Sequence, residues 1–356
     1  METSLRLNLW LTEKRKNNFV NEIAGGIFAG DKWRTSLKIV YMGTPDFAVA
    51  PMLAIAKEHE VLAVFTQPDR ESGRGRKIQK SDVKVAAETL GCPIYQPDRL
   101  RDQENVDILK ELNPDLIVVA AYGQILSEEI LNIPKYGCIN IHASILPKYR
   151  GASPIEASIL NGDEETGVTI MYMAKGLDTG DIISIATTEI RDEDNTETLT
   201  ARLSTMGAEL VVKTIPTLED GTASRTLQKD EESCYAGKLT KEMGRVDFND
   251  SARMVNRKIH AFYPWPCAVT SLREKTCKLL DARALDEKKV SAMLTDLGIS
   301  DVKPGQAFAI TKKKFFIRCK EGALEILKLQ PESKKPMDTV AFLNGFHLEA
   351  GEEFGK

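Results

Sequence analysis

The 356-residue sequence predicts an α/β fold class, with a doubly wound, mostly parallel sheet followed by a small antiparallel β-barrel. Two observations predict it. Between residues 37 and 222, short apolar runs alternate with helical patterns, as in parallel strands joined by crossover helices. Beyond residue 244, short strand-like runs follow one another closely, as in a small barrel. We therefore expect an extension at 1–36, a first domain at 37–222, a linker at 223–243 and a second domain at 244–356.

The strands of the first domain are expected at the apolar runs 37–42, 61–66, 116–121, 138–142 and 166–173. The first run ends at Gly43, as a central parallel strand does. Asp46 is then expected to cap a helix that continues to about His59. Between the later strands, residues 152–160 and 198–218 show the clearest helical patterns.

The second domain is expected to begin its barrel directly after the stretch AFYPWP (261–266). Proline–aromatic strings usually pack at domain corners, so we expect a structural role for Tyr263 and Trp265 rather than a stacking surface. The barrel strands are expected at 267–272, 276–282, 305–311, 314–320 and 324–329.

Composition argues against several classes of protein. No apolar run reaches the roughly 18 residues that span a bilayer, so no membrane association is expected. The six cysteines are scattered without a CxxC pair, which argues against a zinc site or a disulfide framework and favours a reducing compartment. Residues 1–36 lack a signal-peptide core and contain acidic residues that transit peptides avoid. We expect a frayed extension there, or a start site assigned too far upstream.

Charge is distributed unevenly along the chain, whose net charge is −4. From Gly244 onward, 20 Lys and Arg stand against 15 Asp and Glu, a balance of +5, while the rest carries 28 against 37, a balance of −9. A basic second domain beside an acidic first domain fits an enzyme that holds a polyanion. An ordinary solvated surface gives the same balance, so charge alone leaves both interpretations open.

Two side chains at the end of a predicted strand carry the strongest functional signal. Asn140 and His142 are two residues apart, so their side chains leave the same face of the strand 138–142 at its carboxyl end. That end is where open α/β sheets bind ligands. Asp178, in the glycine-flanked sequence KGLDTGDII, is a candidate to orient the imidazole. These three groups, without a nucleophilic Ser or Cys motif, favour direct acyl transfer between two bound substrates. A structural histidine at a strand end is the alternative.

The sequence resembles the formyltransferase family that uses 10-formyltetrahydrofolate, and within it the members that act on methionyl-tRNA. The resemblance runs from about Leu37 to Phe354. It is carried by VYMGTPDFAV (40–49), TQPDRESGRGRK (66–77), AAYGQILSEEIL (120–131), NIHASILPKYRGASPI (140–155), GLDTGDII (176–183), AFYPWP (261–266) and LQPESKKPM (329–337). It implies an OB-like second domain and formyl transfer from 10-formyltetrahydrofolate to initiator methionyl-tRNA. We expect a cytoplasmic monomer that uses no metal.

The resemblance implies a catalytic role for each of the three residues. The α-amine of methionine would attack the formyl carbon and create a tetrahedral intermediate with a developing oxyanion. Asn140 would donate a hydrogen bond to that oxygen, and His142 would stabilise it and pass a proton toward the departing N10. Asp178 would orient His142, directly or through a water molecule.

The resemblance also assigns two loops to the folate pocket. The first contains Ser144, Ile145, Leu146 and Pro147, where the Leu-Pro pair predicts a tight turn with room for a cis bond. Ile145 stands where the family usually has leucine. The second loop consists of Tyr122, Gly123, Gln124, Ile125 and Leu126. A purely structural turn is the alternative for each.

Cationic residues in two places are candidates for binding tRNA. The resemblance assigns GRGRK to the acceptor stem of initiator tRNA, with Arg74 at the key position, on bases or phosphates, and Arg76 and Lys77 on phosphates. In the second domain, a face for the tRNA backbone is expected on neighbouring strand positions at Lys312, Lys313, Lys314, Arg318 and Lys320. A solvated surface is the alternative for both groups.

Other functions are weaker interpretations. The Gly43-Thr44-Pro45 turn lacks the glycine pattern of a dinucleotide-binding loop, which disfavours NAD and the related formyltransferase of purine synthesis. A 10-formyltetrahydrofolate hydrolase or a sugar-amine formyltransferase would use the same catalytic residues but would need neither GRGRK nor a basic barrel. A non-catalytic tRNA-binding module predicts a damaged catalytic set, whereas all three residues are present.

Overall fold

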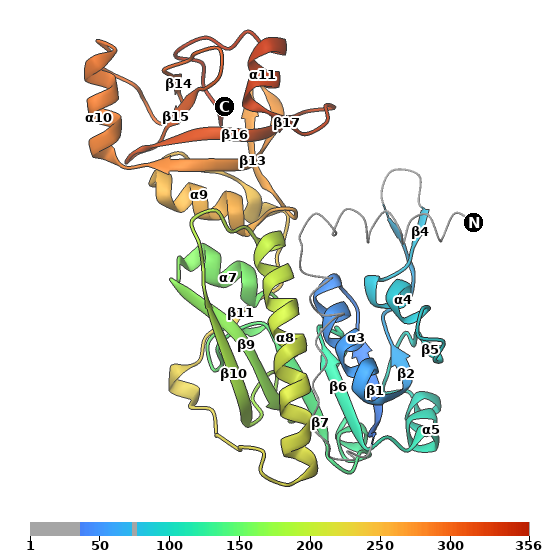
Figure 1. Ribbon diagram of the computed structural model, residues 1–356. Helices are drawn as coiled ribbons and strands as arrows, with labels where there is room; N and C mark the ends of the chain where they lie inside the picture. The colour runs from blue at the N-terminus through green and yellow to red at the C-terminus, as the bar shows by residue number, and fades with distance from the viewer. Residues whose placement is uncertain (1–35, 73–76, 356) are drawn as a thin grey trace. The chain divides into compact units, whose positions relative to one another are not determined.

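The structure is a computed structural model that describes residues 36–72 and 77–355 (Figure 1). The predicted extension, apart from Ser36, lies outside these residues. From Leu37 onward the chain forms one compact unit. Among the described residues, no helix is both long and apolar enough to cross a membrane.

The first part of the chain forms a mixed, mostly parallel sheet, as predicted. Over the described residues this sheet has seven strands in the order β10-β9-β7-β6-β1-β2-β5. Their bounds are β1 (Lys38–Gly43), β2 (Glu60–Phe65), β5 (Ile94–Tyr95), β6 (Leu116–Ala120), β7 (Cys138–His142), β9 (Glu165–Tyr172) and β10 (Ile182–Glu189). β9 is antiparallel to β7, and β10 is antiparallel to β9, whereas the others run parallel. β7 has its predicted bounds, while sequence analysis predicts neither β5 nor β10.

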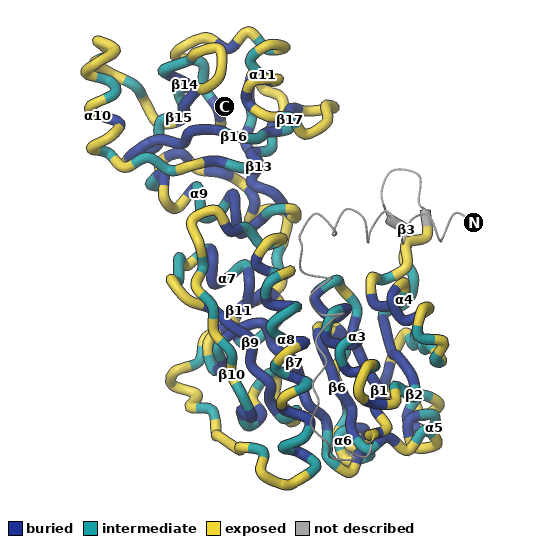
Figure 2. The backbone as a smooth tube through the Cα atoms, viewed as in Figure 1, coloured by how far each residue is buried: buried dark blue, intermediate teal, exposed yellow. Residues whose placement is uncertain are grey.

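Side chains of β1 alternate between two apolar cores on opposite faces of this sheet. Ile39 and Tyr41 belong to a core built with α3 (Val49–Glu58), α4 (Asp82–Ala87), α7 (Pro154–Asn161) and α8 (Thr196–Glu219). Val40 and Met42 belong to a core built with α5 (Gln103–Leu112) and α6 (Glu128–Leu131). Figure 2 shows the central strands as buried. Helices on both faces therefore make the sheet doubly wound.

The helical segment after β1 begins differently from the prediction. A short 3₁₀ helix, η1 (Asp46–Ala48), precedes α3, and Pro45 takes the cap position, with no side-chain cap hydrogen bond among the described residues. The prediction that Asp46 caps the helix is therefore wrong. The extended backbone of Pro45 (ψ 174°) makes Asp46 the first helical residue instead.

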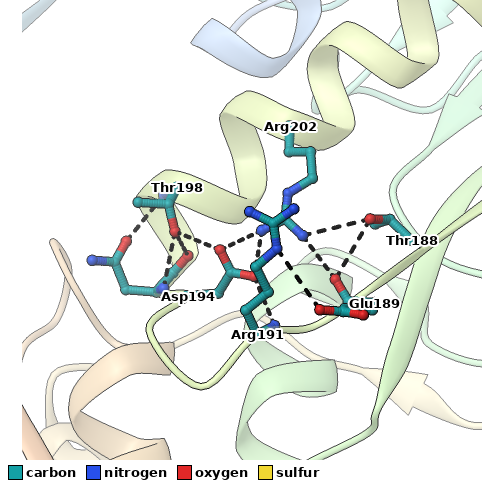
Figure 3. Close-up of polar contacts among 7 residues, drawn as sticks. Thr188, Glu189, Arg191, Asp194, Thr198 and Arg202 are labelled. Atoms are coloured by element: carbon teal, nitrogen blue, oxygen red, sulfur yellow. Dashed lines mark hydrogen bonds and ion pairs between the residues drawn. The ribbon is translucent and has the colours of Figure 1, made fainter. Parts of the chain in front are cut away.

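An ion pair between a buried carboxylate and a half-buried guanidinium fixes the turn between β10 and α8 (Figure 3). The Asp194 carboxylate pairs with the guanidinium of Arg202 and accepts a hydrogen bond from Thr198. Arg202 also donates to the backbone carbonyl of Glu189 at 2.7 Å, at the end of β10. Asn195 and Thr198 form a capping box at the start of α8. These contacts connect the end of the strand to the first two turns of the helix.

The second part forms a curled antiparallel half-barrel. Its sheet counts six strands within the described residues, in the order β12-β13-β16-β15-β14 with β17 beside β16. They are β12 (Ala268–Leu272), β13 (Lys275–Leu285), β14 (Ala307–Phe308), β15 (Phe316–Arg318), β16 (Ala323–Pro331) and β17 (Met337–Asp338). Three helices missing from the sequence prediction accompany these strands, as far as the structure describes the chain: α9 (Ala252–Ala261), α10 (Glu287–Asp296) and α11 (Thr339–Gly345).

Two barrel strands are shorter than predicted. The expected strand 305–311 is reduced to β14 because Gly305 (φ +88°) and Ala309 (φ +50°) leave the extended conformation on either side. The expected strand 314–320 is reduced to β15. Lys312, Lys313 and Lys314 precede β15 and Lys320 follows it, so the predicted strand placement of these four lysines is wrong.

The polar stretch between the two sheets has structure of its own. It contains η2 (Asp230–Glu232), β11 (Tyr235–Ala236) and η3 (Glu242–Gly244). β11 pairs in parallel with β8 (Arg150–Gly151), shortly after the strand that carries His142. The backbone of this stretch is therefore hydrogen-bonded to the first part of the chain.

Candidate active site

Asn140 and His142 lie at the carboxyl end of β7 and are both buried, with 8% and 5% of their surface exposed. The neighbouring residues Ile139 and Ile141 pack into the core on one face of the sheet. Cys138 belongs to the core on the opposite face. Because side chains alternate along a strand, Asn140 and His142 extend from the same face of β7 as Cys138, as their spacing predicts.

Asp178 contacts both of these side chains from the loop between β9 and β10. Its Oδ1 accepts a hydrogen bond from the Asn140 Nδ2 at 3.3 Å. Its Oδ2 lies 3.7 Å from the His142 Nδ1 and accepts from the Gly151 backbone N–H at 2.8 Å. The structure therefore brings the three predicted residues together. One N–H of the Asn140 amide is directed at the Asp178 carboxylate, and the second N–H is left for another acceptor.

Tyr149 fixes the other side of the imidazole. The His142 Nε2 lies 2.9 Å from the Tyr149 backbone oxygen. A carbonyl oxygen only accepts hydrogen bonds, so Nε2 carries a proton, while Nδ1 faces Asp178. The Tyr149 hydroxyl donates to the Asp163 carboxylate at 2.8 Å and accepts from the Asn161 amide at 3.1 Å. Burial is the main cause that raises the pKa of Tyr149 to about 12. Sequence analysis does not identify Tyr149, because a backbone carbonyl leaves no signal in residue type.

The loop after β7 contains the predicted cis bond, between Leu146 and Pro147. Thr169, paired with His142 across β7 and β9, holds this loop from within. Its hydroxyl donates to the Ser144 carbonyl at 2.7 Å and accepts from the Leu146 N–H at 3.1 Å. Ser144 and Leu146 are buried and Ile145 is half-buried. The loop is thus rigidly supported, while its contact with a folate stays a prediction.

The second predicted folate loop follows β6. The Tyr122 carbonyl accepts hydrogen bonds from Thr44 and Gln67, at 3.0 and 3.1 Å. Tyr122 and Leu126 are buried in the core, whereas Ile125 is 80% exposed. The Gln124 side chain bonds to the backbone of residues 97 and 100. Gly123 and Ile125 are therefore the members of this loop that are open to a ligand.

A cleft of about 480 Å³ opens beside this loop. Its walls come from the turns that follow the parallel strands and from the hairpin of β3 (Arg70–Ser72) and β4 (Lys77–Gln79). Residues that line it include Thr44, Gln67, Arg70, Ser81, Gly123 and Lys238. The cleft thus lies at the carboxyl ends of the strands, where ligands bind in open α/β sheets.

The predicted tRNA-binding residues fall into two groups. Arg74 and Arg76 lie outside the described residues, between β3 and β4, and Lys77 is the first residue of β4. In the half-barrel, Lys314 is paired with the buried carboxylate of Glu325 at 2.7 Å. Lys312 and Lys313 are exposed. Their contact with tRNA stays a prediction.

Arg318 is also engaged within the half-barrel, through an ion pair with Glu287 at 2.8 Å.

No group of three or more His, Cys, Asp or Glu side chains in the described ranges is arranged to hold a metal ion. The six cysteines all lie in the described part of the chain and are free thiols.

Comparison with known proteins agrees with this geometry. Residues 37–215 match the formyl transferase family, and residues 238–347 match the formyl transferase C-terminal domain. The chain is 42% identical over 319 residues to the methionyl-tRNA formyltransferase of Agathobacter rectalis, covering 89% of this chain and 99% of the relative. It is 44% identical over 321 residues to the methionyl-tRNA formyltransferase of Lachnospira eligens, covering 90% and 100%.

Solved structures share the fold at lower identity. A HypX variant from Aquifex aeolicus matches with a TM-score of 0.60 at 19% identity, over 87% of this chain and 49% of HypX. The chain thus spans about half the length of HypX, which has also been solved in complex with tetrahydrofolic acid. An N-formyltransferase from Helicobacter canadensis, in complex with folinic acid and dTDP-3-aminofucose, matches with a TM-score of 0.59 at 20% identity, over 82% of this chain and 98% of that one.

The family matches fall on the two sheets, and both sequence relatives align over about nine-tenths of the chain. The chain therefore belongs to the formyl transferase family and, within it, to the methionyl-tRNA formyltransferases.

Proposed function

We propose that this protein transfers the formyl group of 10-formyltetrahydrofolate to the α-amine of methionyl-initiator tRNA, in the cytoplasm. The observation that carries the proposal is the meeting of Asn140, His142 and Asp178 at the carboxyl end of β7. The identity of more than 40% to methionyl-tRNA formyltransferases supports the choice of acceptor.

The reaction begins when the neutral amine attacks the formyl carbon. An aminoacyl ester makes its amine less basic, so the attacking form is available without a strong base. A C–N bond forms, the carbonyl electrons move to oxygen, and the amine loses a proton. Collapse of the tetrahedral intermediate breaks the bond to N10, which takes up a proton as tetrahydrofolate leaves.

The described side chains can carry out these reaction steps. Asn140 has an N–H beyond the one donated to Asp178, and we assign it to the developing oxyanion. His142 exchanges protons through Nδ1, because its Nε2 is engaged by the Tyr149 carbonyl. Asp178 lies beside that Nδ1 and keeps the imidazole oriented. The loops at residues 122–126 and 144–147 are the proposed walls for the folate.

The test is to mix the purified protein with 10-formyltetrahydrofolate and methionyl-initiator tRNA and to count formylmethionine after mild hydrolysis of the ester. Formylation is expected with charged tRNA and not with uncharged tRNA. His142→Ala is expected to lower the rate at least about a hundredfold. The exposed His347 provides the matched control, and His347→Ala should keep the wild-type rate.

Two results would contradict the proposal. Deformylation of the folate at the same rate with and without tRNA identifies a hydrolase. Formylation of a nucleotide-linked amino sugar in place of methionyl-tRNA identifies a sugar-amine formyltransferase.

A further inference from the structure

We propose that Gln228, from the stretch that joins the two sheets, is a positioning residue that holds Asp178 against Asn140 and His142. The proposal rests on the function proposed above. It makes the joining stretch a part of the active site, whereas its polar composition alone indicates a linker.

The side-chain amide of Gln228 uses both of its ends. Its Nε2 donates to the backbone carbonyl of Asp178 at 2.9 Å and to that of Gly180 at 2.7 Å. Its Oε1 accepts from the Nε of Arg150 at 3.0 Å. Gln228 therefore connects the loop that carries Asp178 with β8, whose Gly151 N–H binds the same carboxylate.

The loop needs such support because its backbone is unfavourable. Asp178 has φ +52°, in the left-handed region that residues with a β-carbon adopt rarely, although Asp does so more readily than most. Gly176 and Gly180 flank it, and glycine lets the chain leave this conformation easily. The hydrogen bonds from Gln228 fall on the carbonyls of Asp178 itself and of Gly180, so they favour the conformation in which the carboxylate reaches β7.

Residues 226–236, which we call the bridging segment, are themselves held in place. Thr226 and Ile182 exchange backbone hydrogen bonds at 2.8 and 3.0 Å. The Cys234 carbonyl accepts from the Arg150 N–H at 2.9 Å, and the Ala236 carbonyl accepts from the Ala152 N–H at 2.8 Å. The bridging segment is thus bound at one end to the start of β10, directly after the Asp178 loop, and at the other to β8 and the residue after it. These backbone contacts fix the position of Gln228 independently of its own side-chain hydrogen bonds to the Asp178 loop.

Gln228 is expected to act on the chemical step and not on substrate binding, because its contacts are to backbone carbonyls, to Arg150 and, more weakly, to the Met171 sulfur at 3.9 Å. Gln228→Ala removes every one of these contacts. Gln228→Glu keeps an acceptor for Arg150 but loses the donor to the carbonyls, and it serves as a second variant if the alanine variant folds poorly. We expect both to lower kcat about 10- to 100-fold, with KM for methionyl-tRNA and for 10-formyltetrahydrofolate changed less than about twofold. Gln103→Ala, on the exposed start of α5, is the matched control and should keep the wild-type kcat.

A double-mutant cycle separates positioning from general structure. In single-turnover assays, Asp178→Ala should be slow, and adding Gln228→Ala to it should slow the reaction no further, because nothing remains to be positioned. Additive losses, a wild-type kcat in Gln228→Glu, or a loss confined to KM would overturn the proposal. A wild-type protein that forms no formylmethionine would instead refute the proposed function, so the two failures are distinguishable.

Discussion

Asp178 binds three partners through two oxygens, and each partner comes from a different type of group: an amide side chain, an imidazole and a backbone N–H. The side-chain partners follow from sequence, because the two-residue spacing of Asn140 and His142 is a local property of a strand. Asp178 is 38 residues from Asn140, and a contact of that range is suggested by its glycine-flanked loop and by the family resemblance but not by any local spacing. Tyr149 contacts His142 through its own backbone carbonyl, and Gln228 donates to the backbone carbonyls of Asp178 and Gly180. Contacts with backbone groups leave no pattern of residue types in the sequence.

Gly151 provides a prediction at this scale. It has φ +116°, and a β-carbon there would lie 2.5 Å from the Ala236 carbonyl oxygen. Gly151→Ala should separate β8 from β11 and move the N–H that binds Asp178, so we expect kcat to fall at least about tenfold and the free energy of unfolding to fall by about 1–3 kcal/mol. Assays of formyl transfer and urea denaturation measure both.

Gly137 is the matched control for this variant. It also has a positive φ, +77°, but an added β-carbon meets nothing within 4 Å among the described residues. Gly137→Ala should therefore lose about 1 kcal/mol of stability and no activity. Equal effects of the two substitutions on kcat would refute the role of the Gly151 N–H.

Asp69 predicts how stability depends on pH. A hydrogen bond from the Lys84 ammonium, followed by one from Gln96, lowers the pKa of its carboxyl below 3.8. The folded state therefore holds the ionised form more strongly than the unfolded chain does. This contribution is complete above pH 3.8 and is lost as pH falls through the lowered pKa. Between neutral pH and about pH 3, Asp69→Asn should lose less free energy of unfolding than the wild type in urea titrations. An identical loss in both proteins would exclude this carboxyl as a contributor.

At the scale of the element, sequence pattern predicts buried strands better than partly exposed ones. The central strands are buried along almost their whole length and lie within a residue or so of their predicted positions. After its first two residues, β10 alternates between half-buried and exposed residues, so it lacks the continuous apolar run that marks the central strands. In the half-barrel, positive φ at Gly305 and Ala309 shortens a strand that composition extends. Backbone angles of that kind depend on neighbours that the sequence does not reveal.

The start of α8 provides a prediction for an element. The Asn195 side chain accepts from the Thr198 N–H at 3.0 Å, and the Thr198 hydroxyl accepts from the Asn195 N–H at 3.1 Å. Asn195→Ala should lower the free energy of unfolding by about 1 kcal/mol in urea, because helix N–H groups lose their acceptor. Thr205→Ala, in the middle of the same helix, should be neutral or slightly stabilising. A larger loss from Thr205→Ala than from Asn195→Ala would contradict this account.

At the scale of the whole molecule, charge separates the two parts of the chain more clearly than the net value of −4 does. Ion pairs inside the half-barrel, such as Lys314 with Glu325 and Arg318 with Glu287, leave the balance of +5 unchanged but engage some of the 20 Lys and Arg side chains beyond residue 244. Counting charges in the sequence therefore overstates how many cations remain for a polyanion.

The contrast between paired and available cations yields a prediction about how the binding of tRNA depends on salt concentration. The combined variant Arg74→Ala, Arg76→Ala, Lys77→Ala should weaken the binding of initiator tRNA and reduce the slope of log affinity against log salt by about one per lost phosphate contact. Lys314→Ala should change that slope little, because its ammonium is paired with Glu325. Filter binding over a range of salt concentrations measures both. A slope that stays the same in the triple variant would remove GRGRK from the tRNA interface.

The bridging segment also decides where chimeric proteins can be joined. A graft that replaces everything from residue 223 onward would exchange Gln228, Cys234 and Ala236 together with the half-barrel, although their partners stay behind in the recipient. A junction at residue 238, where the match to the C-terminal domain begins, leaves those contacts native. Half-barrels from relatives can then be compared for their choice of tRNA on an unchanged catalytic background.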